Sequence, residues 1–166
     1  DVHEIPPNGQ GIAALIALGI LERFDLASLR LDSAQSQHLQ IEAMKLAFAD
    51  IYRYVADPSS MDVTPEQMLD DSYLDSRAKL INPAKASDPG FGMPRSGGTV
   101  YLSAADENGM MISFIQSNYM GFGSGIVVPE YGISLQNRGA GFSSDPTSAN
   151  VVAPGKRPFH TIIPAF

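Results

Sequence analysis

Hydrophobic positions in the first half of the chain recur at the three- and four-residue spacing of α-helices. Residues 12–24 are apolar around almost the whole helical circumference, which predicts a buried helix. A longer helix is predicted from a cap at Asp32 or Ser33 to about Val55. Its apolar face is predicted from five positions at helical spacing, Ile41, Met44, Phe48, Ile51 and Val55.

Two shorter helices are predicted from the residues that begin them. Thr64, Pro65 and Gln67 give an N-cap, a proline in the first turn and a capping box. Ser72 with Asp75 then predicts a helix that ends near Ile81. The first 81 residues are therefore expected to be mainly helical.

The period of the pattern changes from 3.6 to 2 after a linker. Residues 82–98 hold three prolines and four glycines, which predicts an exposed and mobile segment. Alternating positions then predict strands at 99–105 and 110–117, joined by a turn that contains Asn108-Gly109. Further short strands are predicted at residues 2–5, 126–128, 132–136 and 159–163. Helices followed by strands predict a layered packing of helices on sheets.

Composition narrows the classes of function. The net charge of −7 and the pI near 4.7 argue against nucleic acid as a partner. The absence of cysteine excludes disulfides, thiol nucleophiles and thiolate metal sites. We find no apolar run long enough to span a membrane and no signal-peptide pattern, so no membrane partner is expected. The compartment stays undecided, with a slight preference for the cytoplasm.

The junction between the linker and the first long strand has the chemistry of a self-cleavage site. Thr99 follows Gly97-Gly98 and begins the strand. A threonine with a free α-amine carries a general base beside its own hydroxyl. A preceding glycine leaves room for close intramolecular attack. The alternative is an ordinary strand that starts with threonine after two glycines.

Several motifs, taken in order and spacing, resemble the gamma-glutamyltransferase family across essentially the whole chain. They are TVYLSAAD at 99–106, GFGSG at 121–125, GKRP at 155–158, PPNGQG at 6–11 and HLQIEAMKLAFADIYRYVAD at 38–57. The resemblance implies an α+β fold, the four-layer αββα arrangement of N-terminal-nucleophile hydrolases. This arrangement would be incomplete here, because both ends of the chain fall within predicted structure.

The resemblance also implies how the chain is divided and what it does. Residues 1–98 would be the C-terminal part of a large subunit with its linker, and residues 99–166 the start of a small, catalytic subunit. Cleavage between Gly98 and Thr99 would free the Thr99 amine, which would then serve a ping-pong reaction through an acyl-enzyme. The reaction needs no metal and no cofactor. The family's oxyanion-hole glycines and its carboxylate-binding arginine lie outside this chain.

Five positions of the substrate site depart from the family pattern, while Ser117 takes the place of its second hydroxyl residue. Tyr119 stands where the family usually has asparagine, and Arg138 replaces an amide residue. Gly141 replaces the aspartate expected to hold an α-amine, and the paired serines after Arg-Pro become His160 and Thr161.

These departures favour a substrate that carries a carboxylate without a nearby ammonium, since Arg138 can hold a carboxylate by two hydrogen bonds. The pattern resembles the branch with oxamate amidohydrolase and cephalosporin-acylase-like proteins. The alternatives are a surface ion pair for Arg138, a satisfied buried histidine for His160 and an ordinary strand hydroxyl for Ser117.

The remaining candidates are interpreted as structural. The GFGSG stretch lacks the lysine and helix start of a phosphate loop, so a turn that shapes the pocket is expected. His3 and His38 show no metal-ligand spacing, and Lys156 and Arg157 are expected to order a loop.

The sequence thus predicts a self-processing threonine amidohydrolase or acyltransferase that cleaves γ-glutamyl compounds such as glutathione, or shorter acidic amides such as oxamate. Two alternatives are an acylase for bulkier amides and an unprocessed, inactive relative used for binding. The expected partners are a small amide substrate and the remainder of both subunits, and a homodimer of the processed heterodimer is left open.

Overall fold

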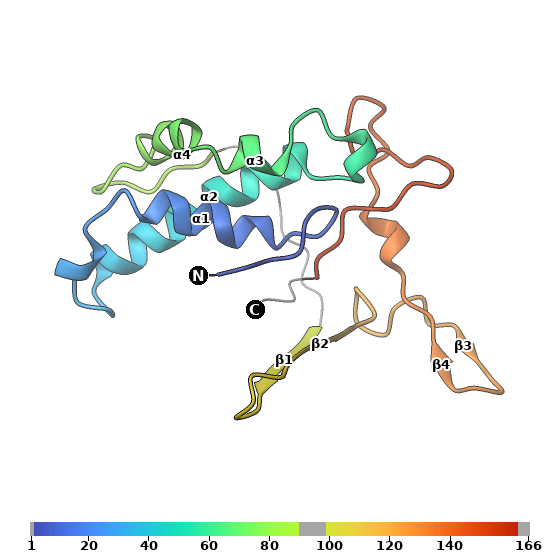
Figure 1. Cartoon of the computed structure of the whole chain (residues 1–166). Coiled ribbons are helices and arrows are strands. Elements are labelled where there is room, and N and C mark those ends of the chain that lie inside the picture. Colours follow the sequence, from blue (N-terminus) through green and yellow to red (C-terminus); the bar gives the residue numbers. More distant parts are fainter. Residues whose placement is uncertain (1, 90–98, 163–166) are drawn as a thin grey trace.

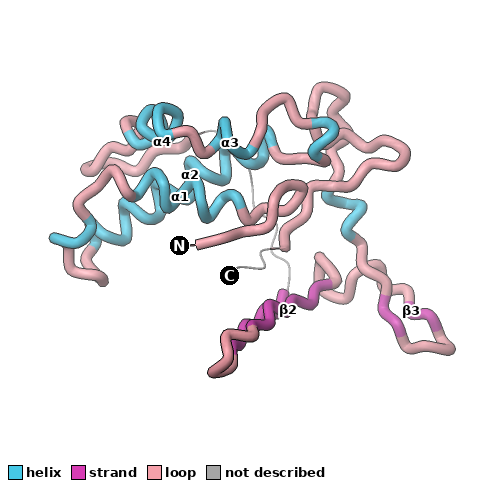
Figure 2. The backbone as a smooth tube through the Cα atoms, in the orientation of Figure 1, coloured by secondary structure: helices cyan, strands magenta, loops and turns pink. Residues whose placement is uncertain are grey.

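The computed structural model describes residues 2–89 and 99–162, without the side chains of residues 99–101. The helices α1 to α4 lie together, and two hairpins project from one side of them (Figure 1). The last described segment returns beneath the helices to the N-terminal loop. The mixture of helical and strand regions confirms the α+β class, while the four-layer arrangement stays a prediction (Figure 2).

The core is built around the contact of α1 (Ile12–Leu21) with α2 (Ala34–Tyr54). Both helices were predicted, and Ser33 caps α2 by accepting a hydrogen bond from the Ser36 amide at 3.2 Å. The buried face of α2, however, is only partly the predicted one. Ile41 and Met44 are 56% and 37% exposed.

The actual buried apolar face of α2 is rotated toward a neighbouring stripe of the same helix. Its members are Leu39, Ala43, Leu46, Ala47 and Ile51. The two alanines are small, so α1 can pack closely against them. They fit a 3.6-residue period as well as the larger side chains do. The pattern alone therefore could not say which stripe is covered.

Two short helices, α3 (Pro65–Met68) and α4 (Asp71–Ala78), complete the helical part. The capping box of α3 is confirmed, with Gln67 and Thr64 exchanging hydrogen bonds. The start of α4 was predicted too late, because Asp70 accepts from the Ser72 and Tyr73 amides and so is the cap. The predicted end near Ile81 was three residues too far.

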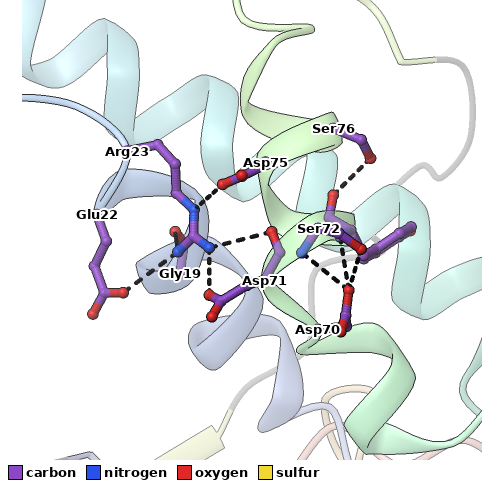
Figure 3. Close-up of polar contacts among 9 residues, drawn as sticks. Gly19, Glu22, Arg23, Asp70, Asp71, Ser72, Asp75 and Ser76 are labelled. Carbon is purple, nitrogen blue, oxygen red and sulfur yellow. Dashed lines mark hydrogen bonds and ion pairs between the residues drawn. The ribbon is translucent and has the colours of Figure 1, made fainter.

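Arg23 ties α4 to the end of α1. Its guanidinium donates to Asp71 at 2.5 Å, to Asp75 at 2.8 Å and to the Gly19 carbonyl at 2.9 Å (Figure 3). Asp71 and Asp75 lie one helical turn apart, so one planar guanidinium reaches both.

Glu42 holds the described start of the linker against α2. This buried carboxylate accepts from Lys45 Nζ at 2.7 Å, from the Ser87 amide at 2.9 Å and from the Ser87 hydroxyl. Burial alone would raise the pKa of Glu42, but the hydrogen bonds from Lys45 and Ser87 outweigh it and lower the pKa to about 2. The linker is thus mostly exposed over residues 82–89, as predicted, yet anchored at Ser87. Residues 90–98 lie outside the described part.

The second half of the chain confirms the predicted hairpin. β1 (Thr99–Ala105) pairs antiparallel with β2 (Met111–Ser117), and Gly109 occupies the turn with φ +82°. The later strands are shorter than predicted, β3 (Val127–Val128) and β4 (Ile133–Ser134). The predictions of strands at 2–5 and 159–163 are wrong over the described residues. Only isolated bridges form there, one of them between Gly9 and His160.

The buried apolar side chains of the described part lie in the helical half, joined by Phe159 from the far end of the sequence. The hairpins leave large apolar side chains half exposed, among them Leu102, Ile112 and Phe114. Within the described ranges, no helix has the length and apolar character needed to cross a membrane.

Candidate functional site

The hairpin register brings the two predicted catalytic positions level with each other. Thr99 opens β1 and Ser117 closes β2, and the two residues are partners in the antiparallel ladder. The Cα atoms of such partners lie about 4.5–5.5 Å apart. Gly98, the other half of the predicted cleavage site, lies outside the described residues. The candidate site is therefore built from the Ser117 end of the hairpin outward.

Arg138 connects Ser117 to the C-terminal segment. Its Nη2 donates to Ser117 Oγ at 3.2 Å, and its Nη1 donates to Thr161 Oγ1 at 3.0 Å. The guanidinium carbon lies 5.1 Å from the centre of the Tyr119 ring, within cation–π range. The structure therefore gathers four of the predicted site residues, although they are spread over 45 positions of the sequence.

Arg138 is a buried cation with no acidic partner among the described residues. The residue is only 5% exposed. In the described part of the chain its hydrogen-bond partners are neutral hydroxyl groups, and no carboxylate lies within ion-pairing distance of it. Burial lowers the pKa of Arg138, yet guanidinium groups stay protonated in proteins. The surface ion pair considered from the sequence is thus absent from these residues, and the site is suited to an anion.

Tyr119 has an unusual backbone conformation beside this arginine. Its φ is +75°, a value that costs a non-glycine residue about 1–2 kcal/mol. The Tyr119 amide donates to Ser117 Oγ at 3.0 Å. A methyl group on Gly141 would lie 3.8 Å from the Tyr119 hydroxyl. Tyr119 therefore occupies the space beside Gly141 and covers one face of Arg138.

His160 lies next to the site but is held by the backbone. Its Nδ1 accepts from the Ile162 amide at 3.2 Å, and its own amide donates to the Asn8 carbonyl at 2.9 Å. Burial first, and the charge of Arg138 second, lower the pKa of His160 to about 4. With Nδ1 accepting, the proton of the neutral ring is on Nε2. At neutral pH Arg138 is thus the cation of this cluster and His160 is uncharged.

The neutral state of His160 predicts a specific dependence of stability on pH. The pKa of about 4 in the folded protein lies below the usual histidine value of 6.5, so the native state binds fewer protons between these values. This contribution to stability is complete above about pH 6.5 and is lost as the pH falls toward 4. In the full-length protein, His160→Gln should therefore lose less stability than the wild type between pH 7 and 4.5, measured by urea unfolding. Equal losses in the two proteins would contradict the assignment of a neutral histidine.

Sequence reasoning missed the asparagines that hold the loops of the site. Asn8 Nδ2 donates to the Pro158 carbonyl at 2.6 Å. Asn150 donates to the Gly141 carbonyl at 2.8 Å and accepts from the Phe159 amide at 2.9 Å. Asn8 belongs to a recognised motif, but the partner lies 150 residues away, and no local signal gave Asn150 a role.

The other candidates make contacts within the protein. Lys156 donates to the Ala149 carbonyl, Arg157 pairs with Asp57, and His38 Nε2 lies 2.9 Å from the Asn82 carbonyl oxygen. The GFGSG stretch forms a loop in which Gly121, Gly123 and Gly125 all have positive φ. Among the described residues, no group of three or more potential ligands is placed to hold a metal ion.

The chain is thus an α+β fold in which a buried arginine, suited to binding an anion, lies at the end of a hairpin. Comparison with known proteins identifies its family. The family described as gamma-glutamyltranspeptidase matches residues 1–166. The chain belongs to this family.

Three similar proteins illustrate the match. The oxamate amidohydrolase proenzyme of Klebsiella pneumoniae is 44% identical over 97% of this chain and 30% of its own length. The glutathione hydrolase-like YwrD proenzyme of Bacillus subtilis is 38% identical over 99% of this chain and 31% of its own length. The crystal structure of cephalosporin acylase from Bacillus halodurans aligns with a TM-score of 0.89 and 55% identity, over 99% of this chain and 30% of that one. The chain thus spans about a third of the length of these relatives.

Proposed function

We propose that this chain is the junction of a self-processing amidohydrolase that uses Thr99 as its nucleophile and prefers small amides bearing a carboxylate. Residues 1–98 would belong to the large subunit and residues 99–166 to the small one. The observation that carries the proposal is the buried Arg138, which lacks a carboxylate partner in the described residues and donates to Ser117, the ladder partner of Thr99. The names of two relatives, an oxamate amidohydrolase proenzyme and a glutathione hydrolase-like proenzyme, support it.

The proposed chemistry starts with the chain itself. Thr99 Oγ attacks the Gly98 carbonyl, the Gly98–Thr99 C–N bond breaks to leave an ester, and water hydrolyses that ester. The freed Thr99 amine has a reference pKa of about 7.7–8.0, which suits a base at neutral pH. In turnover it takes the proton of Thr99 Oγ as this oxygen attacks the substrate amide. Ammonia or an amine leaves, and water then hydrolyses the acyl-enzyme.

Arg138 and its neighbours would select the substrate. The guanidinium offers a fixed fork of donors that matches a carboxylate, and burial strengthens the interaction. Tyr119, Thr161 and His160 would form the walls around it, with His160 contributing a neutral Nε2–H. No acidic side chain at position 141 is available to pair with an ammonium, so a γ-glutamyl group would lose water there without gaining a charge partner.

Ser117 is proposed to tune Thr99 without being acylated. Its Oγ accepts from the Tyr119 amide and from Arg138 Nη2, so both lone pairs are engaged. The proposed role of the hydroxyl is to donate its hydrogen toward Thr99. Ser117→Ala should lower turnover by roughly ten- to a hundredfold, the loss of about 1–3 kcal/mol. The matched control is Ser113→Ala, in the same strand opposite Ser103. Unchanged processing and turnover in Ser117→Ala, or an acyl group trapped on Ser117, would reject the role.

The proposed function is tested on the purified full-length protein. We expect two chains by intact mass, with one beginning at Thr99. We also expect ammonia release from oxamate with a much higher kcat/KM than glutathione hydrolysis. Efficient glutathione turnover without oxamate hydrolysis would contradict the substrate class. A single uncut chain without turnover would favour an inactive binding relative.

An acylase for bulkier amides is the second candidate. It is favoured by the 55% identity to the Bacillus halodurans cephalosporin acylase. Turnover of a cephalosporin side-chain amide, with none of oxamate, would support this candidate over the first.

A further inference from the structure

Residues 157–160 are fastened to the helical half of the chain at every position. Arg157 pairs with Asp57, the Pro158 carbonyl accepts from Asn8, and the Phe159 ring is buried in the helical core. The His160 amide then donates to the Asn8 carbonyl. We call residues 157–160 the docking segment. The very next residue, Thr161, is the one that contacts Arg138.

Asp57 is the charged anchor of the docking segment. Its Oδ2 accepts from the Arg157 amide at 3.2 Å and from Arg157 Nε at 3.1 Å, while its Oδ1 accepts from the Ser59 amide and hydroxyl at 3.1 and 2.8 Å. The Asp57 side chain is 10% exposed, whereas Arg157 is 64% exposed. The Ser59 hydroxyl first, and then the Arg157 amide and guanidinium, hold the pKa of Asp57 well below its usual range. Asp57 is thus ionised. It accepts two hydrogen bonds from Ser59, in the helical half, and two from Arg157, in the docking segment.

The apolar contact lies beside this anchor. Phe159 stacks edge-on against Tyr52 of α2, with the ring centres 5.8 Å apart. The buried Phe159 ring holds the docking segment against the helices. The Asp57 contacts hold the same segment two residues earlier, at Arg157. Neither contact touches Arg138 itself, but the segment leads directly into Thr161, which donates no hydrogen bond to the described helices and accepts from Arg138 Nη1.

We infer that Asp57 is a positioning residue, which holds the docking segment on the helical half and thereby sets Thr161 and His160 against Arg138. The inference rests on the proposed function in that the pocket it shapes is the proposed carboxylate pocket. If the chain is cut at Gly98–Thr99, the Asp57, Asn8 and Tyr52 contacts all join two separate chains. The large subunit would then determine the shape of a pocket whose substrate-binding residues belong to the small subunit.

The variant that tests this inference is Asp57→Asn in the full-length protein. Asparagine keeps an acceptor oxygen for Ser59 but places an NH₂ group against the two N–H donors of Arg157. The control is Asp32→Asn, the same chemical change at a pair, Arg30 with Asp32, whose side chains are 85% and 80% exposed. Arg157→Ala should have an intermediate effect, because it removes the guanidinium contact with Asp57 but keeps the hydrogen bond from the backbone amide of residue 157.

Two readouts separate positioning from general destabilisation. Hydrogen exchange at the His160 amide should accelerate about tenfold or more in Asp57→Asn, by less in Arg157→Ala, and not in Asp32→Asn. The KM for oxamate should rise in the same order, with kcat changing less. Unchanged exchange at His160 in Asp57→Asn, or faster exchange with an unchanged KM, would overturn the inference.

The exchange measurement does not depend on the substrate. A wild-type protein that fails to hydrolyse oxamate would contradict the proposed function, and exchange at His160 would still show whether Asp57 holds the docking segment on the helical half. If Asp57→Asn does not fold, Arg157→Ala decides it alone: exchange and KM equal to those of Asp32→Asn would overturn the inference.

Discussion

Thr99→Ala in the full-length protein should yield one uncut chain with no amide hydrolysis. The substitution removes the oxygen that attacks Gly98 and, in turnover, the oxygen that attacks the substrate, so both reactions lose their nucleophile. Removal of a catalytic nucleophile typically costs about four to six orders of magnitude in rate. Intact mass gives the state of the chain, and ammonia release from oxamate gives the turnover.

Thr99→Ser is the matched control for this prediction. Serine keeps a hydroxyl at the start of β1, so the variant should still cut, more slowly than the wild type. Cleavage by pure Thr99→Ala, or a new N-terminus at another residue, would show that Thr99 is not the processing nucleophile.

Arg138→Lys should produce the second large effect, a loss of carboxylate recognition. An ammonium cannot reproduce a planar fork that reaches Ser117, Thr161 and a carboxylate together. Removing one partner of a buried charge pair costs roughly 2–5 kcal/mol. Lysine keeps the charge and loses only the planar fork, so we expect the lower end of this range, about 1.5 orders of magnitude in kcat/KM. We expect a fall of this size for oxamate, measured by initial rates.

Arg53→Lys is the control for the chemical change itself. Arg53 also stacks on a tyrosine, with its guanidinium carbon 5.7 Å from the centre of the Tyr54 ring, but it lies on α2 and belongs to no part of the proposed site. Its replacement should leave oxamate turnover unchanged. Equal kcat/KM values in Arg138→Lys and Arg53→Lys would mean that Arg138 does not hold the substrate.

Local signals in the sequence predicted the local structure well. The Ser33 and Thr64 caps and the Asn108-Gly109 turn each involve groups only a few residues apart, so their chemistry can be identified without the fold. The same turn fixed the hairpin register and hence the pairing of Thr99 with Ser117. These predictions needed no knowledge of what covers either face of an element.

Predictions that depended on tertiary packing were weaker. Ile41 and Met44 have the spacing of a core stripe, but α1 packs on the alanine-containing stripe beside them. Residues 159–162 have strand composition, yet in the described part His160 pairs only as an isolated bridge with Gly9. Burial and pairing of this kind are decided by distant segments, which a periodic pattern does not identify.

In the candidate site, too, local sequence signals identified individual residues but not their long-range contacts. Arg138 and Thr161 were predicted as candidate site residues from the family resemblance, while their direct contact became known only from the structure. The Asp57–Arg157 pair spans 100 positions. Arg157 was expected to order a loop, but nothing in the sequence identified Asp57 as its partner. Long-range polar contacts of this sort carry no periodicity and no motif of their own.

Whether Arg138 selects a carboxylate-bearing amide can be measured by comparing oxamate with oxamide as substrates. The two substrates share the scissile amide and differ in whether a carboxylate or a second neutral amide stands beside it. We expect the wild-type protein to have a kcat/KM for oxamate higher than that for oxamide by about 30-fold or more, and we expect Arg138→Lys to remove most of this ratio. Equal kcat/KM values for oxamate and oxamide in the wild-type protein would show that Arg138 does not select the carboxylate.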